Sequence, residues 1–123
     1  MDIKPSDTEA VVRNHLQAFL DQKGIAAIVK DYDDDAQFIS EGRTYHGRPE
    51  ISDFFEDFMA SLPPHAINRF SLRSLRVEGN MAYITWSVGH EIPLGTDTFL
   101  VSNGKIVSQT FAMYAAPGAI AAA

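Results

Sequence analysis

The sequence contains no cysteine, which excludes disulfide bonds, thiolate metal ligands and cysteine nucleophiles. It is also poor in basic residues: 10 Lys and Arg stand against 16 Asp and Glu, for a formal net charge of −6. The basic residues form no run, so nucleic acid or an anionic membrane is not expected as the main partner. No apolar stretch approaches the length of a membrane span, and the first ten residues lack the apolar core of a signal peptide. We therefore expect a cytoplasmic protein.

What is present suits one small folded domain. The 123 residues are 46% hydrophobic and 21% charged, which is ordinary for a globular protein. We expect a single domain over 1–123, with an ordered core from about 8 to 114 and a mobile tail over 116–123. The four histidines show no ligand spacing, so neither a metal ion nor a cofactor is expected.

Apolar residues at helical spacing predict three helices, over 6–23, 25–32 and 51–62. The third carries a broad apolar stripe that includes Phe54 and Phe58, and two prolines end it. Between the second and third helices, the acidic run 33–35 is predicted to be a solvated helix terminus. A strand over 36–41 and a loop over 42–50 are expected to follow.

From residue 66 the apolar period changes to two, which is typical of strands. The pattern predicts four of them, over 67–78, 81–92, 96–102 and 105–115. The chain is therefore expected to be α+β, with three helices packed on a strongly curved mixed or antiparallel sheet. Because helices can cover only one face of such a sheet, a curved sheet beneath them would enclose a pocket.

The segment GHEIPLGTDTF, residues 89–99, contains the candidate catalytic pair. If residues 93–94 form a two-residue turn, His90 lies directly opposite Asp97 on the neighbouring strand. Alternation then places both side chains on the apolar, helix-facing side, together with Trp86. A slip of one residue would separate them.

A carboxylate in such apolar surroundings should have a raised pKa through desolvation, whereas a nearby imidazolium would lower it. If protonated, Asp97 could donate a hydrogen bond to a substrate oxygen; if ionised, it could orient His90 as a base. The alternative is a satisfied polar contact at the sheet edge, because structural ion pairs also perturb pKa values.

The order of these elements resembles the nuclear transport factor 2-like superfamily, which includes ketosteroid isomerase and the SnoaL-like polyketide cyclases. The segments that carry the resemblance are DYDDDAQF, HGRPEISDFF and DTFLVSNGKIVSQTF. They belong to a match that runs from about Thr8 to Tyr114. The resemblance implies a cystatin-like cone in which helices and a bent sheet surround a deep apolar pocket. It also implies a homodimer, which we expect to form through the outer face of the sheet.

The resemblance assigns roles to five positions. Asp97 matches the acid of the isomerase oxyanion hole, and with His90 it resembles the catalytic His/Asp arrangement of the cyclases. His15 falls where the isomerase has its oxyanion-hole tyrosine, and Tyr32 falls at an aromatic position that lines the same cavity. Ser40 occupies the place of the isomerase general base, which a hydroxyl cannot replace without a base of its own. A true ketosteroid isomerase is therefore not expected.

The predicted function is a pocket for a small apolar ligand, with Asp97 and His90 as the catalytic acid/base pair acting on a small carbonyl compound. Cyclase, isomerase and dehydratase chemistry all fit this prediction. Two alternatives remain open, a non-catalytic binding or sensing domain and a dimerisation module. The expected partner is a small hydrophobic or aromatic molecule, with no nucleic acid and no membrane. The expected ligand-binding residues are His15, Tyr32, Phe38, Ser40, Phe54, Phe58, Trp86, Phe99, Gln109, Phe111 and Met113.

Overall fold

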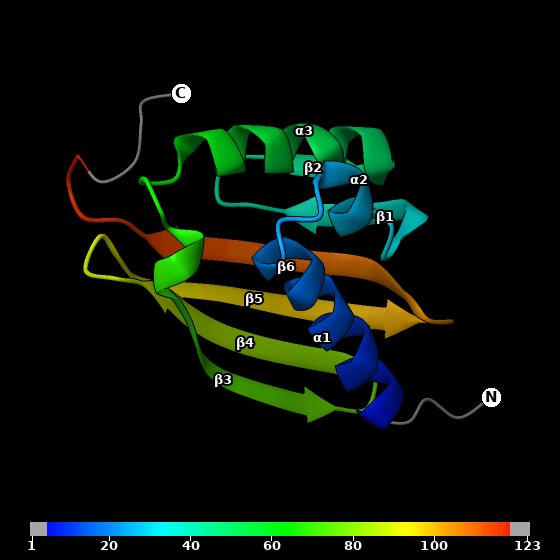
Figure 1. The fold of residues 1–123 in the computed structure, drawn as a ribbon. Helices are drawn as coiled ribbons and strands as arrows, with labels where there is room; N and C mark the ends of the chain where they lie inside the picture. The colour runs from blue at the N-terminus through cyan, green and yellow to red at the C-terminus, as the bar shows by residue number, and fades with distance from the viewer. Residues whose placement is uncertain (1–4, 119–123) are drawn as a thin grey trace.

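The computed structural model describes residues 5–118, which form three α-helices, a short 3-10 helix and six strands (Figure 1). Most of the predicted tail therefore lies outside the described residues. The elements follow the order α1 (Pro5–Leu20), α2 (Ile25–Val29), β1 (Tyr32–Ile39), β2 (Thr44–His46), α3 (Gly47–Ser61), η1 (Ile67–Arg69), β3 (Phe70–Glu78), β4 (Met81–Val88), β5 (Ile92–Ser102) and β6 (Lys105–Tyr114).

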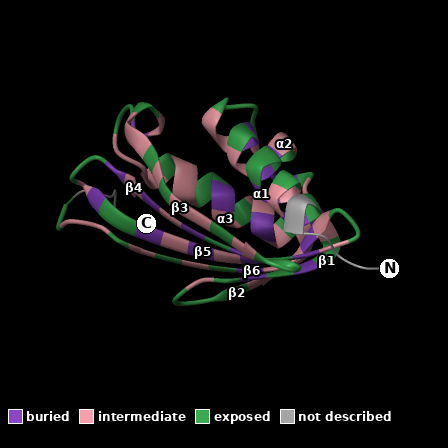
Figure 2. Cartoon of the chain, turned by 90° about the horizontal axis from the view of Figure 1, so that it is seen from below, coloured by how far each residue is buried: buried purple, intermediate pink, exposed green. Residues whose placement is uncertain are grey.

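The six strands form one mixed sheet in the order β2-β1-β6-β5-β4-β3. β1 runs parallel to β6, and every other neighbouring pair is antiparallel. Four of these five pairings contain a register shift, and such bulges bend a strand and increase its twist. The sheet is curved and not closed into a barrel, and the helices lie on one side of it (Figure 2). The predicted α+β fold class is confirmed.

Two helices divide the inner face of the sheet between them. α1 packs against β3, β4 and β5, whereas α3 packs against β1 and β2 (Figure 1). The short α2 bridges the two helices. Inward-facing side chains alternate along the strands as predicted; β4, for example, buries Ala82, Ile84, Trp86 and Val88.

The acidic run is part of a strand, which corrects the predicted helix terminus. α2 ends at Val29, and β1 already begins at Tyr32. The charges are tolerated because the pairing of β1 with β6 is interrupted between Tyr32 and Gln37. There Asp34 stays exposed and forms an ion pair with Arg48 at 3.1 Å.

The predicted loop over 42–50 contains β2 and the first residues of α3, so that prediction is wrong. Pro49 lies in the first turn of α3, where a missing N–H costs nothing. The Glu50 carboxylate accepts a hydrogen bond from the His46 backbone N–H at 2.9 Å, which supports the start of the helix. Pro49 followed by Glu50 is a signal for the start of a helix. The nearby Gly42 and Gly47 favoured a loop in the sequence and led to the wrong prediction.

Candidate functional site

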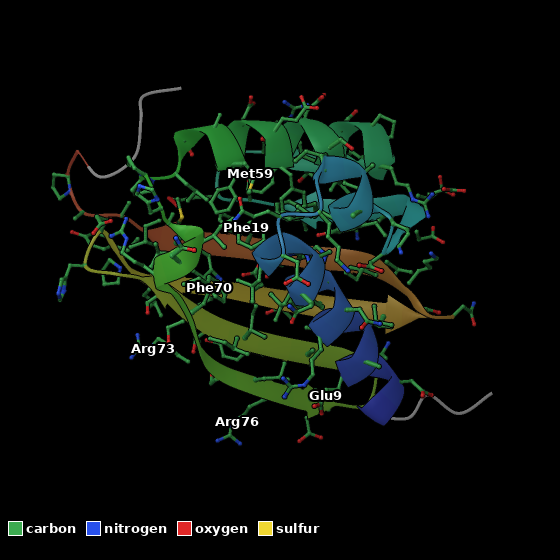
Figure 3. The ribbon with its side chains drawn as sticks, in the orientation of Figure 1. Glu9, Phe19, Met59, Phe70, Arg73 and Arg76 are labelled. Atoms are coloured by element: carbon green, nitrogen blue, oxygen red, sulfur yellow. The ribbon has the colours of Figure 1, made fainter. Side chains whose placement is uncertain are left out.

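A cavity lies between the inner face of the sheet, α1, α3 and the segment that follows α3. About 50 Å³ of it is accessible to the centre of a water molecule. At one side, the Phe19 ring of α1 and the Phe70 ring of β3 are 6.2 Å apart between centres (Figure 3). The walls are mainly aromatic and aliphatic, with three polar side chains among them. The lining residues are His15, Leu16, Phe19, Phe55, Phe58, Leu62, Ala66, Ile67, Phe70, Ile84, Trp86, Val88, Asp97, Phe99, Gln109 and Phe111.

Asp97 is the charged group of this cavity. Its side chain is buried on the inner face of β5, and both carboxylate oxygens accept hydrogen bonds. Trp86 Nε1 donates to Oδ1 at 2.7 Å, and Gln109 Nε2 donates to Oδ2 at 2.7 Å. Burial raises the pKa of Asp97 to about 6, because desolvation outweighs the two hydrogen bonds that favour the ionised form. The carboxyl can therefore exist in either protonation state near neutral pH.

Buried hydrogen bonds continue from Gln109 to α1. The Tyr32 hydroxyl donates to Gln109 Oε1, and it lies 3.4 Å from His15 Nε2. An ionised Asp97 accepts only, so the Gln109 amide must face it with nitrogen and must face Tyr32 with oxygen. The single hydroxyl proton of Tyr32 is then used in the hydrogen bond to Gln109. A neutral His15 must therefore donate from Nε2 to the Tyr32 hydroxyl oxygen. Protonation states and orientations along this relay are therefore linked from Asp97 to His15.

His15 is neutral at physiological pH. Desolvation lowers its pKa to about 4, and a contact with the Ile28 backbone offsets only part of this effect. His15 Nδ1 is buried and has no hydrogen-bond partner within residues 5–118. The Tyr32 hydroxyl likewise stays protonated, because burial raises its pKa well above the usual range. Asp97 is thus the one member of the relay that titrates between pH 5 and 8.

The predicted pairing of His90 with Asp97 is wrong. Val88 pairs with Ile92, so the turn between β4 and β5 consists of residues 89–91, and His90 is exposed within it. Asp97 lies opposite Ile84 instead. The face assigned to Asp97 was correct because the register differs from the predicted one by an even number of residues.

The position of the turn follows from two glycines. Gly89 has a φ of 52°, in the left-handed region that glycine adopts without strain. Gly95 is an inner-face strand residue opposite Trp86, and a Cβ there would overlap the indole ring. An ion pair between Arg69 and Glu91 further fixes the turn at 89–91. Gly95 therefore makes room for Trp86 and does not form a turn.

Six of the predicted ligand-binding residues line the cavity, and five do not. The six are His15, Phe58, Trp86, Phe99, Gln109 and Phe111, and the five are Tyr32, Phe38, Ser40, Phe54 and Met113. Tyr32 contacts the site only through the relay. Phe38 is buried against Phe54, with ring centres 4.4 Å apart, and the Ser40 hydroxyl donates to the Arg43 carbonyl at 3.0 Å.

Nine lining residues were not predicted. Leu16, Phe19 and Phe55 occupy helical positions next to predicted ones, so helical spacing could have identified them. Phe70, Ile84 and Val88 alternate inward on β3 and β4. Leu62 ends the predicted helix over 51–62 and Ile67 begins the predicted strand over 67–78, so both lie at the limit of a periodic segment. Ala66 lies between the two, where no periodic signal exists.

Within residues 5–118, no three His, Asp or Glu side chains lie close enough together to hold a metal ion. Among the helices described, none combines the length and apolar character needed to cross a membrane.

Comparisons with known proteins identify solved structures that share this architecture. Solved structures with the same fold include an NTF-2-like protein of unknown function from Burkholderia xenovorans LB400, with 23% identity, a TM-score of 0.71, and coverage of 92% of this chain and 89% of that one. An NTF2-like protein of unknown function from Mesorhizobium loti shows 20% identity and a TM-score of 0.74, with coverage of 93% and 96%. A de novo designed protein with a curved β-sheet shows 19% identity and a TM-score of 0.75, with coverage of 91% and 88%.

No curated protein matches the sequence. Because a designed chain shares the fold, the architecture alone assigns no activity, and the function depends on the residues of the site. A family model described as the SnoaL-like domain matches residues 12–109. The chain therefore belongs to the SnoaL-like domain family, and it shares its fold with NTF2-like proteins.

Proposed function

We propose that the protein binds a small, mainly apolar molecule that carries a carbonyl or related oxygen, and that Asp97 exchanges a proton with it. The observation that supports this most directly is the position of Asp97. It is buried, it lines the cavity, and its pKa of about 6 lies close to neutral. A general acid or base works best when its pKa lies near the working pH.

The partners of Asp97 leave its proton free for a ligand. Trp86 can only donate, and Gln109 donates in the observed orientation. In that orientation a proton on Asp97 has no acceptor among these two partners and is available to a ligand in the cavity. When ionised, the same carboxylate is held in place by two donors and can take a proton from a carbon next to a carbonyl group.

Asp97 performs this role without an imidazole partner of the predicted kind, since His90 is outside the cavity. The relay through Gln109, Tyr32 and His15 fixes the orientation of the Gln109 amide and thereby the geometry at Asp97 Oδ2. We assign Gln109 as a positioning residue and Asp97 as the single acid/base.

The cavity volume limits the ligand. About 50 Å³ holds a few water molecules at roughly 10–15 Å³ each, whereas benzene occupies an engineered cavity of about 150 Å³. A single ring or a short chain can enter if Phe19, Phe58 or Phe70 at the walls changes rotamer. A fused polycyclic substrate would require a much larger rearrangement.

The test is solvent deuterium incorporation next to the carbonyl of cyclohexanone and phenylacetone, followed by proton NMR. We expect the protein to accelerate exchange with an apparent pKa near 6, and Asp97→Asn to abolish the acceleration while the chain stays folded. The exposed variant His90→Asn is the matched control and should retain full exchange. Unchanged exchange in Asp97→Asn would remove the assignment, and ligand binding without exchange would favour the non-catalytic alternative.

We further propose that a second copy of the chain covers the outer face of the sheet. This face exposes several large apolar side chains, among them Met81 beside Leu100, and Tyr83. Exposed apolar patches of this kind on a sheet favour a symmetric dimer. Sedimentation analysis should give twice the chain mass, and Tyr83→Glu should shift the protein to the monomer; a monomeric wild type would refute the pairing.

A further inference from the structure

A groove on the surface adjoins the cavity. It has a volume of about 290 Å³, and Leu62, Ala66 and Ile67 line both the groove and the cavity. These three side chains therefore form the wall between the two spaces. Met59, on the face of α3 that borders this region, also lines the groove (Figure 3). Movement of the Leu62 or Ile67 side chain would join the cavity to the groove.

The backbone at the groove is unusual. Among the described residues, three that are not glycine have a positive φ: Gln22 at 53°, His65 at 60° and Asn103 at 52°. Asn103 belongs to the Asn-Gly turn between β5 and β6, where such a conformation is common. The other two, Gln22 and His65, both line the groove.

Gln22 lies just after the end of α1, at a position that glycine usually occupies. The Gln22 N–H donates to the Phe19 carbonyl at 3.2 Å, and the Lys23 N–H donates to the Ala18 carbonyl at 3.2 Å. These two bonds define a Schellman motif, whose left-handed residue is most often glycine because it has no Cβ. Gln22 therefore places a long amide side chain in a left-handed conformation that residues with a Cβ rarely adopt.

His65 occupies an equivalent position in the turn that follows α3. The Ala66 N–H donates to the Pro63 carbonyl at 3.1 Å, which closes a turn with His65 in its third place. A positive φ at this place favours glycine or asparagine. Two separate segments thus bear a strained polar residue, and both of these residues lie on the same groove. Strained residues cluster where the side chain has a function.

We propose that the groove is an outer subsite, which rests on the proposed function of the cavity, and that it binds an uncharged hydrogen-bonding group at the far end of the ligand. Gln22 and Asn68 present amides that can donate and accept, and the His65 imidazole can do either. Among the residues that the structure describes, no Lys, Arg, Asp or Glu lines the groove, which favours an amide or hydroxyl over a carboxylate or ammonium group. The ligand is thus elongated, with an apolar ring in the cavity and a neutral polar end in the groove.

The experiment compares two probes, 4-ethylphenol and 3-(4-hydroxyphenyl)propionamide, which share the phenol ring and differ by the amide end. Trp86 is the only tryptophan and lines the cavity, so its fluorescence reports binding of both probes. In the wild type we expect the amide probe to bind about fivefold more tightly, the gain of one or two net hydrogen bonds.

In Gln22→Gly and His65→Gly this ratio should fall to about one, while the melting temperature is unchanged or higher because glycine relieves the backbone strain. Asn103→Gly makes the same backbone substitution away from the groove and should keep the fivefold ratio. Gln22→Asn keeps an amide and His65→Asn replaces the imidazole with one. Asparagine tolerates the left-handed region, so both variants should retain most of the ratio.

If 4-ethylphenol binds but the amide end adds no affinity, or if the glycine variants keep the fivefold ratio, the outer subsite is refuted and the cavity assignment stands. If neither probe changes the Trp86 fluorescence, the proposed function and the outer subsite both fail.

Discussion

The interior of this protein has a filled half and a hollow half, although both are rich in aromatic residues. Under α3, the Phe38 ring packs on Phe54 with centres 4.4 Å apart and on Phe55 at 5.9 Å, and Phe38 is fully buried. Under α1, Phe19 lies 6.2 Å from Phe70 and borders the cavity. The polar relay ends at Asp97 in the hollow half. Aromatic residues therefore do not mark a ligand site by themselves; incomplete packing beside a desolvated carboxyl does.

Removing a ring should cost most in the filled half. Phe38→Ala is expected to reduce the free energy of unfolding by about 4 kcal/mol, because a buried ring leaves a void that the tight surroundings cannot collapse into. Phe58→Ala, in the wall of the hollow half, should cost less than about 3 kcal/mol since Phe58 is only half-buried. Urea denaturation of both variants measures the difference. Equal losses would show that the two halves are packed alike.

In the hollow half, two buried groups should make stability depend on pH in opposite directions. The pKa of Asp97 is about 6 in the folded protein against 3.8 for an unburied carboxyl, so the folded state keeps its proton to higher pH. Stability therefore falls as pH rises from 3.8 to 6. The pKa of His15 is about 4 against 6.5, so the unfolded state takes up the proton first and stability falls as pH drops from 6.5 to 4. Each effect amounts to about 3 kcal/mol.

Between pH 4 and 6 the two effects nearly cancel in the wild type. Asp97→Asn should reveal the His15 contribution, so that this variant loses about 3 kcal/mol on acidification relative to the wild type. His15→Gln should show the reverse and gain stability toward pH 4. Denaturation curves at pH 4, 5, 6 and 7 give the slopes. Parallel curves for all three proteins would mean that neither group is desolvated.

Gly95→Ala should have an intermediate effect because its neighbour can move. The new methyl would overlap the Trp86 indole, which must swing into the cavity and lose its hydrogen bond to Asp97. We expect a loss of about 2 kcal/mol, within the range for overpacked sites, and a shifted Trp86 emission maximum. An unchanged emission spectrum would show that the ring stays in place and that the strand adjusts instead.

The sequence predicted the parts of the fold that depend on local pattern. Alternation along β4 identified Trp86 as an inward residue, and the break between the strands predicted over 96–102 and 105–115 was confirmed, because each of these signals acts over a few residues. The β4–β5 turn was misplaced because the role of Gly95 depends on Trp86, which is close only after the strands pair. Packing between residues that are distant in the sequence produces no periodic pattern of apolar residues.

The candidate site was predictable to a similar extent. Asp97 was predicted from the apolar face of its strand and His15 from the family resemblance. Gln109 was also among the expected ligand-binding residues, and all three line the cavity. Their connection through Tyr32 could not be deduced, because β1 lies beside β6 only through a parallel pairing of distant segments. The cavity itself depends on which rings fill the space under each helix, and patterning specifies the face of a side chain but not the void beside it.

The smallest effect is expected at His90, and it bears directly on whether Asp97 acts alone. His90 is exposed in the 89–91 turn and does not line the cavity, so His90→Ala should change stability by no more than about 0.5 kcal/mol. Its deuterium exchange rates and their pH profile should equal those of the wild type, whereas Asp97→Asn abolishes exchange. If His90→Ala instead lowered the exchange rate tenfold with its fold intact, the turn would have to close over the cavity during the reaction. The His90 imidazole would then be a partner of Asp97 during the reaction. The 89–91 turn, which does not line the cavity in this structure except through its neighbour Val88, would form part of the active site.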